Sequence, residues 1–387
     1  MRGRRNYAAR MGWMLSSDSH VIEPPDLWDG SGGALADRMP HVERLDDGDW
    51  WIVDGLKTMS FLGIQTGDRF ANEPDKLRTS GTFSEVRAAA YEPRRYVEEN
   101  ESDGIWGSVL YPSQGLVLYE VPVTDVVSAS MRRYNDWLAD FCSEAPERLK
   151  GIAMLNVDDI DEAVAELSRC RERGLVGALI TVAPPDWQPY RSPAYDPLWA
   201  AAQDLGTPLA LHVGTDRADP RVGRAAFRLD VKNVPPSVFV NPDAQVRRAF
   251  AEIIFSGVFE RFPRLRIGSV EHELGWIPFF LDRLDYAYTD RPPRGPEWHR
   301  FSDPGALPSD FFRRNAFASF QEDPHALRLL DVLGPGVPTW GSDYPHTEST
   351  FPRSREIVAS RVKDLDEADA ERITCTTCAE LYGFDVP

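Results

Sequence analysis

Four of the seven histidines lie at or just after short apolar segments that have the character of β-strands. The first such segment ends in Asp18-Ser-His20, and side chains two residues apart share one face of a strand. His212 ends a later segment, His272 follows another, and Asp343 follows the last. Carboxylates and imidazoles that converge from several strands are typical ligands of a divalent ion such as Zn²⁺ or Mn²⁺. The pattern therefore predicts a metal centre.

The alternative is that these residues have separate structural roles. A single histidine at a strand end usually forms a structural hydrogen bond, and the sequence Asp-x-His arises often by chance. The coincidence of four histidines and two aspartates with predicted strand ends is what favours a metal centre.

The segments that carry these residues alternate between short apolar strands and amphipathic helices. Strands separated by helices indicate parallel βαβ units. Helical spacing of apolar residues predicts helices over 158–173 and 196–205. Eight strands are expected, over 14–17, 105–111, 151–156, 176–181, 208–212, 266–270, 316–320 and 337–341. Eight units favour an α/β fold of the (β/α)₈ TIM-barrel type over an open doubly wound sheet, which is the alternative.

A barrel of this kind exposes its functional side chains at the carboxyl ends of the strands, and two long segments follow such ends. Residues 24–100 form a turn-rich insertion after strand one, in which two apolar arms joined by Asp54-Gly55 predict a β-hairpin. Residues 213–243 form a long loop after strand five that contains several prolines and arginines and is long enough to be a lid. Both segments are expected to lie over the predicted metal centre.

The composition fits a single folded domain. The chain has 387 residues, of which 42% are hydrophobic and 27% charged, as in ordinary globular proteins. Its 43 Lys+Arg and 61 Asp+Glu give a net charge of −18, which argues against nucleic acid and anionic membranes as partners. We expect an N-terminal arm over 1–13 and one barrel domain over 14–387 that includes the insertion 24–100.

The sequence also predicts a cytoplasmic location. No apolar run approaches the ~20 residues of a membrane-spanning helix, and the basic first ten residues are not followed by the apolar stretch of an export signal. Four cysteines are too few and too scattered for a disulfide framework. The pair Cys375 and Cys378 is expected to be reduced and partly buried in a C-terminal helix.

The residues above, in this order, resemble the amidohydrolase superfamily. The resemblance is to the amidohydrolase-2 branch, which contains aminocarboxymuconate-semialdehyde decarboxylase and γ-resorcylate decarboxylase-like enzymes. It runs from about Ser16 to Phe384 and is carried by four local strings: DSHVIEPPDLW after strand one, HVG at strand five, EHELGWIPFFLDRLD at strand six and WGSDYPH at strand eight.

The resemblance implies a site and an assembly. Asp18, His20, His212 and Asp343 would hold one divalent metal, His272 would be the catalytic histidine beside it, and the protein would be a homodimer. Better-known relatives carry His-x-His or Glu-x-His on strand one, so the aspartate here is a departure that lets Mn²⁺ compete with Zn²⁺. The string VGALIT of strand four has no counterpart of the lysine that bridges two metals, which indicates a single ion.

Three functions are considered, of which the first is favoured and the other two are alternatives. The first is metal-dependent, non-oxidative decarboxylation of a small aromatic or unsaturated carboxylic acid, with Asp343 carrying a proton to or from carbon and His272 polarising the substrate or activating a water. The second is metal-dependent hydrolysis of an amide, ester or lactone, for which the same residues would serve. The third is a non-catalytic, metal-supported binding protein.

Five other residues carry weaker expectations. Glu271 is expected to orient the histidine that follows it or to pair with an arginine. His346 is expected to contact a substrate carboxylate or to cap its own loop. His41, His299 and His325 are expected in loops or at helix starts, with surface roles.

Overall fold

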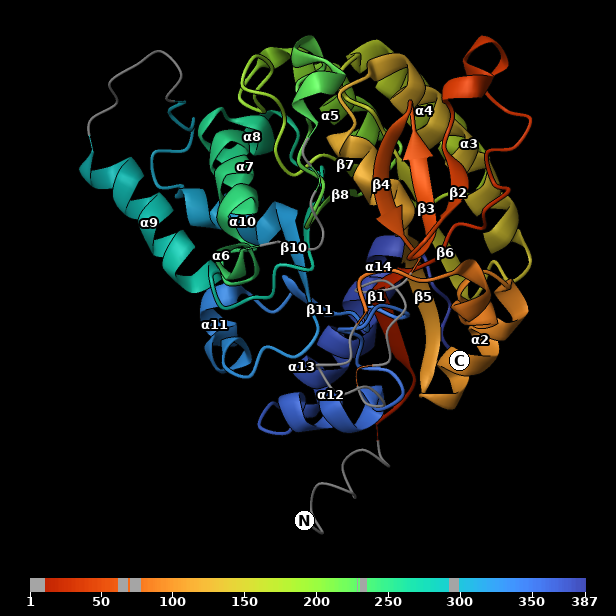
Figure 1. The fold of residues 1–387 in the computed structure, drawn as a ribbon. Helices are drawn as coiled ribbons and strands as arrows, with labels where there is room; N and C mark the ends of the chain where they lie inside the picture. The colour runs from red at the N-terminus through yellow and green to blue at the C-terminus, as the bar shows by residue number, and fades with distance from the viewer. Residues whose placement is uncertain (1–10, 62–68, 70–77, 228, 230–234, 292–298) are drawn as a thin grey trace.

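Eight parallel strands run in sequence order around the centre of the molecule in the computed structural model (Figure 1). The structure describes residues 11–61, 69, 78–227, 229, 235–291 and 299–387. The strands are β1 (Met14–His20), β5 (Ile105–Tyr111), β6 (Leu149–Met154), β7 (Gly177–Ile180), β8 (Leu209–His212), β9 (Ile267–Val270), β10 (Ala316–Phe320) and β11 (Pro338–Trp340). Each one corresponds to an expected strand, which confirms the (β/α)₈ barrel.

The barrel closes between its first and last strands. The backbone N–H of Asp343 donates to Asp18 O at 2.9 Å, and the N–H of His20 donates to Tyr344 O at 2.6 Å. Strand β1 extends to His20, three residues beyond the expected end at 17. The sequence SSDSH is polar but fully buried, because it lies at the closure of the barrel instead of facing solvent.

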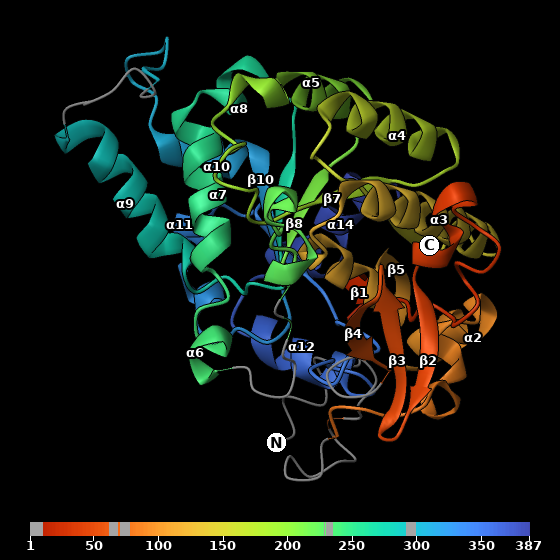
Figure 2. The same cartoon turned by 45° about the horizontal axis from the view of Figure 1, so that its top comes forward.

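Helices surround the strands, as expected for βαβ units (Figure 2). They are α2 (Pro93–Ser102), α3 (Thr124–Ser143), α4 (Ile160–Glu172), α5 (Asp196–Asp204), α6 (Pro236–Phe239), α7 (Ala244–Phe255), α8 (Val258–Arg261), α9 (Ile277–Asp290), α10 (Pro308–Asn315), α11 (Leu330–Leu333), α12 (Ser354–Val362), α13 (Glu367–Glu371) and α14 (Thr377–Tyr382). The two expected helices match α4 and α5. Helix α4 begins after Asp159, whose side chain accepts a hydrogen bond from the Glu162 N–H at 3.0 Å and so caps the first turn.

The insertion after β1 contains a three-stranded antiparallel sheet, made of β2 (His41–Leu45), β3 (Gly48–Val53) and β4 (Leu56–Ser60). Strands β3 and β4 form the expected hairpin, and Asp54 and Gly55 both have positive φ, as a tight primed turn requires. Strand β2 was not expected, so the placement of His41 in a loop or at a helix start was wrong. A short, charged edge strand lacks the apolar alternation that reveals central strands.

The loop after β8 contains short helical turns, at Pro220–Val222, Arg224–Ala226 and α6. Residues 228 and 230–234 of this loop, 62–68 and 70–77 of the insertion, and most of the expected N-terminal arm lie outside the described residues. Helices of the described ranges are all too short or too polar to cross a membrane. Cys375 lies in a π-helical turn (Arg372–Thr376) before α14 and Cys378 in α14, and both are free thiols.

Candidate metal centre

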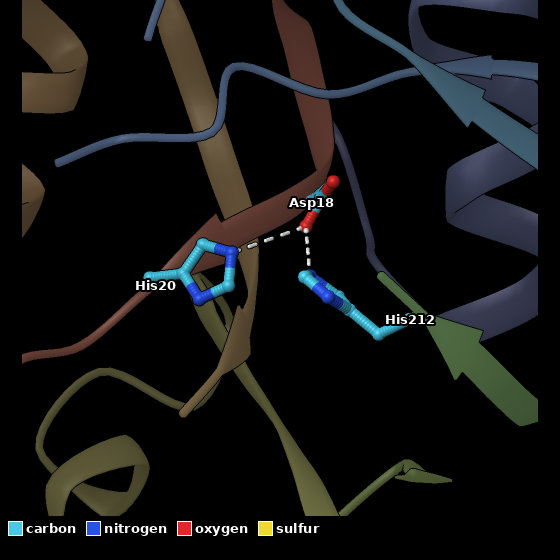
Figure 3. A group of neighbouring side chains, drawn as sticks. All are labelled: Asp18, His20 and His212. Carbon is cyan, nitrogen blue, oxygen red and sulfur yellow. Dashed lines mark ion pairs between the residues drawn. The ribbon is translucent and has the colours of Figure 1, made fainter. Parts of the chain in front are cut away.

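Asp18, His20 and His212 meet at the carboxyl ends of β1 and β8 (Figure 3). Asp18 Oδ1 lies 3.6 Å from His20 Nε2 and 3.6 Å from His212 Nε2, so the carboxylate sits between the two imidazoles. All three side chains are buried. The expectation that Asp18 and His20 point into the same space is confirmed.

Backbone carbonyls orient the two imidazoles. His20 Nδ1 lies 2.8 Å from Pro112 O, and His212 Nδ1 lies 2.9 Å from Val213 O. A carbonyl only accepts, so each Nδ1 carries the proton and donates it. The Nε2 atom of each ring lies toward Asp18 and is the atom left to bind a metal. Donation of the Nδ1 proton to a backbone carbonyl is the usual arrangement in histidines that bind a metal through Nε2.

Asp343 and His346 approach the same point from the end of β11. Asp343 Oδ1 lies 3.3 Å from His20 Nε2 and 3.0 Å from His346 Nδ1. The Nε2 atom of His346 lies 2.9 Å from Ser113 Oγ. Asp343 has φ 56°, a left-handed conformation that is uncommon outside glycine and that often marks functional sites.

Glu271 and His272 enter the centre after β9. Glu271 has φ 62°, which turns its side chain toward the barrel axis, and its Oε2 lies 3.4 Å from His212 Nε2. Among the described residues the carboxylate of Glu271 faces His212 and contacts neither His272 nor an arginine, so neither expected role is seen there. His272 is buried, its Nδ1 lies 3.2 Å from Ser269 Oγ, and its Nε2 has no hydrogen-bond partner among the residues that the structure describes.

The electrostatics of the cluster favour a cation. Burial and the neighbouring Asp18 carboxylate raise the pKa of Asp343 well above its usual value, and burial with the Asp343 charge does the same to the pKa of Glu271. Burial works against a charged His212, but Asp18 and Glu271 outweigh it and raise the pKa of His212 to about 9. Three carboxylates thus crowd around a position where positive charge is stabilised.

A divalent ion fits this set of donors. Six buried atoms lack hydrogen-bond partners within the described part of the chain, namely Asp18 Oδ1, His20 Nε2, His212 Nε2, His272 Nε2 and both carboxylate oxygens of Asp343. Ligands about 2.0–2.2 Å from a shared ion lie roughly 3–3.5 Å from one another, close to the separations found here. Two sets of three donors each fall within 4.8 Å, one formed by Asp18, His20 and His212 and the other by His20, Asp343 and His346.

The sequence analysis did not predict the orientation of Glu271 or the contribution of Ser319 to the centre. Glu271 was noticed, but its left-handed backbone, which redirects the side chain, is not visible in the sequence. Ser319 Oγ lies 3.4 Å from Asp18 Oδ2 and accepts the Glu271 N–H at 3.0 Å, so it joins β1 to the turn after β9. The sequence feature that could have revealed Ser319 is that it is a polar residue near the carboxyl end of the otherwise apolar strand β10.

Comparisons with known proteins identify the family and the fold of this chain. A family model described as Amidohydrolase matches residues 115–384. A γ-resorcylate decarboxylase of Rhodococcus jostii is 30% identical over 271 residues, which cover 66% of this chain and 76% of that protein. An amidohydrolase of Mycobacterium avium subsp. paratuberculosis has a similar structure, with a TM-score of 0.76 and 19% identity over 97% of this chain and 99% of that one. A dihydroxybenzoic acid decarboxylase of Polaromonas with bound manganese has a TM-score of 0.62 and 18% identity, covering 96% of this chain and 97% of that one.

Proposed function

Because the chain belongs to the amidohydrolase family, we propose that it is a metal-dependent, non-oxidative decarboxylase of a small aromatic or unsaturated carboxylic acid. The observation that carries the proposal is that a buried imidazole whose Nε2 is unpartnered, His272, and a buried carboxyl group, Asp343, both belong to the cluster proposed to bind a cation. The similarity to γ-resorcylate decarboxylase supports the choice of reaction.

We propose that Asp18, His20, His212 and Asp343 hold one divalent ion. Their unpartnered buried atoms support this ligand set, as do the distances of 3.6 Å from Asp18 to each imidazole and of 3.3 Å from Asp343 to His20. The ion is proposed to be Zn²⁺, for which two imidazoles are good ligands, with Mn²⁺ as the alternative favoured by the carboxylates and by the manganese of the Polaromonas structure.

A divalent ion held by Asp18, His20, His212 and Asp343 would supply positive charge for the substrate carboxylate and for the negative charge that loss of CO₂ leaves on carbon. Asp343 would carry the proton to this carbon, because a carboxyl group beside the ion can both bind the ion and take up or release a proton. His272 is neutral, because burial and the nearby His212 lower its pKa to about 3. Its Nε2 is free to polarise the substrate while Ser269 Oγ contacts Nδ1 and holds the ring.

Burial keeps water from competing with the substrate for these groups. Asp18, His20, His212, His272 and Asp343 are each at most 2% exposed. A low-dielectric surrounding strengthens each charge interaction at the reacting carbon and limits the proton donors to those the protein supplies. This is the condition under which one carboxyl group can deliver a proton to carbon selectively.

The wider organisation is also proposed. The barrel domain spans 14–387 with the insertion 24–100, after an arm over 1–13, and the protein acts as a homodimer in the cytoplasm. The net charge of −18 supports a small molecule as the partner in preference to nucleic acid or an anionic membrane. Light scattering of the purified protein would measure the assembly directly.

Isotope labelling tests the reaction. Turnover of a panel of hydroxybenzoates in D₂O should release CO₂ and place deuterium on the carbon that carried the carboxylate. Asp343→Asn should abolish this turnover, and the metal content of the variant must be measured because Asp343 is also a proposed ligand.

The two alternatives have distinct outcomes in the same experiment. A hydrolase would cleave esters, amides or lactones and incorporate oxygen from ¹⁸O-labelled water, with no CO₂ released and no deuterium on carbon. A metal-supported binding protein would retain metal and turn over none of the three classes. Either result would replace the decarboxylase proposal.

A further inference from the structure

A fully buried carboxylate, Glu23, lies three residues after His20 and outside the proposed ligand set. Among the described residues, no arginine, lysine or histidine forms an ion pair with it, and burial raises its pKa to about 7. A buried charge without a counter-ion is costly unless hydrogen bonds stabilise it. The groups that donate to Glu23 therefore indicate what this residue does in the fold.

Two backbone N–H groups of the loop after β5 bind this carboxylate. The N–H of Gln114 donates to Glu23 Oε2 at 2.9 Å, and the N–H of Gly115 donates to Glu23 Oε1 at 2.9 Å. Hydrogen bonds to a charged acceptor are stronger than those between neutral groups. Because each oxygen has its own donor, the carboxylate fixes both the position and the orientation of the loop.

The same loop carries the groups that hold two histidines of the metal centre. Pro112 O accepts the hydrogen bond of His20 Nδ1 at 2.8 Å, and Ser113 Oγ lies 2.9 Å from His346 Nε2. Pro112 and Ser113 directly precede the two residues whose N–H groups bind Glu23. A displacement of the loop would therefore alter both histidine contacts at once.

The packing around Gly115 also indicates a tightly held loop. A Cβ atom at this position would lie 2.7 Å from Pro112 Cβ, 2.8 Å from Met154 Sδ and 3.1 Å from Glu23 Oε1. The first two separations are shorter than real Cβ contacts, so glycine is needed for this close approach of the backbone. The loop is thus enclosed between Glu23 after β1 and Met154 at the end of β6.

We propose that Glu23 is a positioning residue of the metal centre, whose carboxylate holds the loop after β5 so that Pro112 O and Ser113 Oγ keep the imidazoles of His20 and His346 in place. The inference rests on the proposed metal centre, because His20 is one of its proposed ligands. Glu23 acts through the loop and is not itself a ligand. Groups that orient the ligands of a metal commonly change its affinity when they are removed.

Metal binding by variants of Glu23 tests this role, with Co²⁺ as the probe, at about pH 8, above the pKa of the carboxyl group. Glu23→Gln keeps the shape of the side chain but turns one acceptor oxygen into an N–H donor that faces a backbone N–H. The affinity for Co²⁺, measured by competition with a chromogenic chelator, should fall about tenfold to hundredfold. The visible absorption spectrum of bound Co²⁺ should also change, since it depends on the geometry of the ligands. Glu23→Asp, which keeps the charge, should restore part of the affinity.

Glu166→Gln separates this role from a loss of stability. Glu166 is also a buried carboxylate, but it pairs with Arg169 at 2.7 Å and accepts from Asn135 Nδ2 at 2.9 Å, between α3 and α4. Its substitution should lower the melting temperature and leave the affinity and spectrum of Co²⁺ unchanged. Gly115→Ala crowds the same loop from the other side and should weaken Co²⁺ binding as Glu23→Gln does. It carries the test if Glu23→Gln does not fold.

The outcomes distinguish a failure of this inference from a failure of the metal centre. Wild-type affinity and spectrum in Glu23→Gln and Gly115→Ala would overturn the role of Glu23 and leave the metal centre intact. An equal loss of affinity in Glu166→Gln would also overturn it, because reduced stability would then account for the effect. Absence of Co²⁺ binding by the wild type, or undiminished binding by His20→Ala, would overturn the metal centre and this inference with it.

Discussion

The imidazole of His346 stacks on that of His20, with ring centroids 3.9 Å apart and planes inclined by 24°. His346 also reaches Asp343 Oδ1 through Nδ1 at 3.0 Å and Ser113 Oγ through Nε2 at 2.9 Å. Its ring therefore connects the loop after β5 to the end of β11 and lies against a proposed metal ligand. Of the two roles expected for His346, a contact within the protein is the one that these distances describe.

Loss of this ring should weaken the metal centre. We expect His346→Leu to reduce metal affinity by about tenfold to hundredfold, the usual effect of removing a group that orients a ligand. Competition with a chromogenic chelator measures the affinity. Ser113→Ala, which removes only the contact at Nε2, should have a smaller effect. If His346→Leu lost the metal entirely while His212→Ala retained it, the set of His20, Asp343 and His346 would be the binding site.

Substitution of the proposed ligands should remove the ion. His20→Ala and His212→Ala should each lose most of the bound metal in elemental analysis, because each imidazole supplies one of about four donors. His325→Ala is the matched control, since His325 precedes a 3₁₀ turn on the surface, and it should keep full occupancy. Full metal content in both ligand variants would exclude the proposed site.

His272 should be needed for turnover and dispensable for metal binding. We expect His272→Asn to lower kcat by about 10²–10⁴-fold, the typical contribution of an acid–base group, with metal content unchanged. Ser269→Ala, which frees the ring at Nδ1, should lower kcat less. A His272→Asn variant within a few-fold of wild type would assign His272 a structural role.

The pH dependence of turnover should reflect a neutral His272. Burial disfavours the imidazolium and lowers the pKa of His272 to about 3, and a cation nearby acts in the same direction. Lowering the pH through 6.5, where an ordinary histidine becomes protonated, should therefore not inactivate the enzyme through this residue. In the wild type, kcat/KM should fall because of His272 protonation only below about pH 5. This fall should be absent in His272→Asn. An acid limb near 6.5 that is lost in this variant would contradict a neutral buried ring.

Glu260 should make stability depend on pH in the acid range. Burial raises its pKa, but contacts with His299 and with the N–H and hydroxyl of Ser302 outweigh this and lower the pKa to about 2. Since the folded value lies below the unfolded value of about 4.5, the stabilisation is complete above pH 4.5 and is lost as the pH falls toward 2. We expect Glu260→Gln to cost about 1–2 kcal/mol at pH 6, after allowance for solvent screening, and progressively less in acid. Urea unfolding at several pH values measures the difference, and a constant difference would contradict the linkage.

The sequence predicted the parts of this structure that depend on periodicity. All eight strands and the convergence of Asp18, His20 and His212 follow from apolar segments whose polar ends must meet in a closed parallel barrel. Features set by individual backbone angles or by exposed edges were missed. Glu271 faces His212 because its φ is positive, and strand β2 exists because β3 offers it a partner.

The closure of the barrel has a consequence for how the protein is made. Asp18 and Asp343 are joined by a backbone hydrogen bond, yet more than three hundred residues separate them in the chain. A ribosome releases the N-terminal partner long before the C-terminal one, so a nascent chain holds Asp18 and His20 without a complete set of neighbours. Until β11 has been synthesised, one edge of β1 has no neighbouring strand. The polar side chains of β1, which are buried in the folded protein, then lie at an open edge of the sheet. The proposed ligand set, which includes Asp343 after β11, is therefore complete only when the last strand of the barrel has been synthesised.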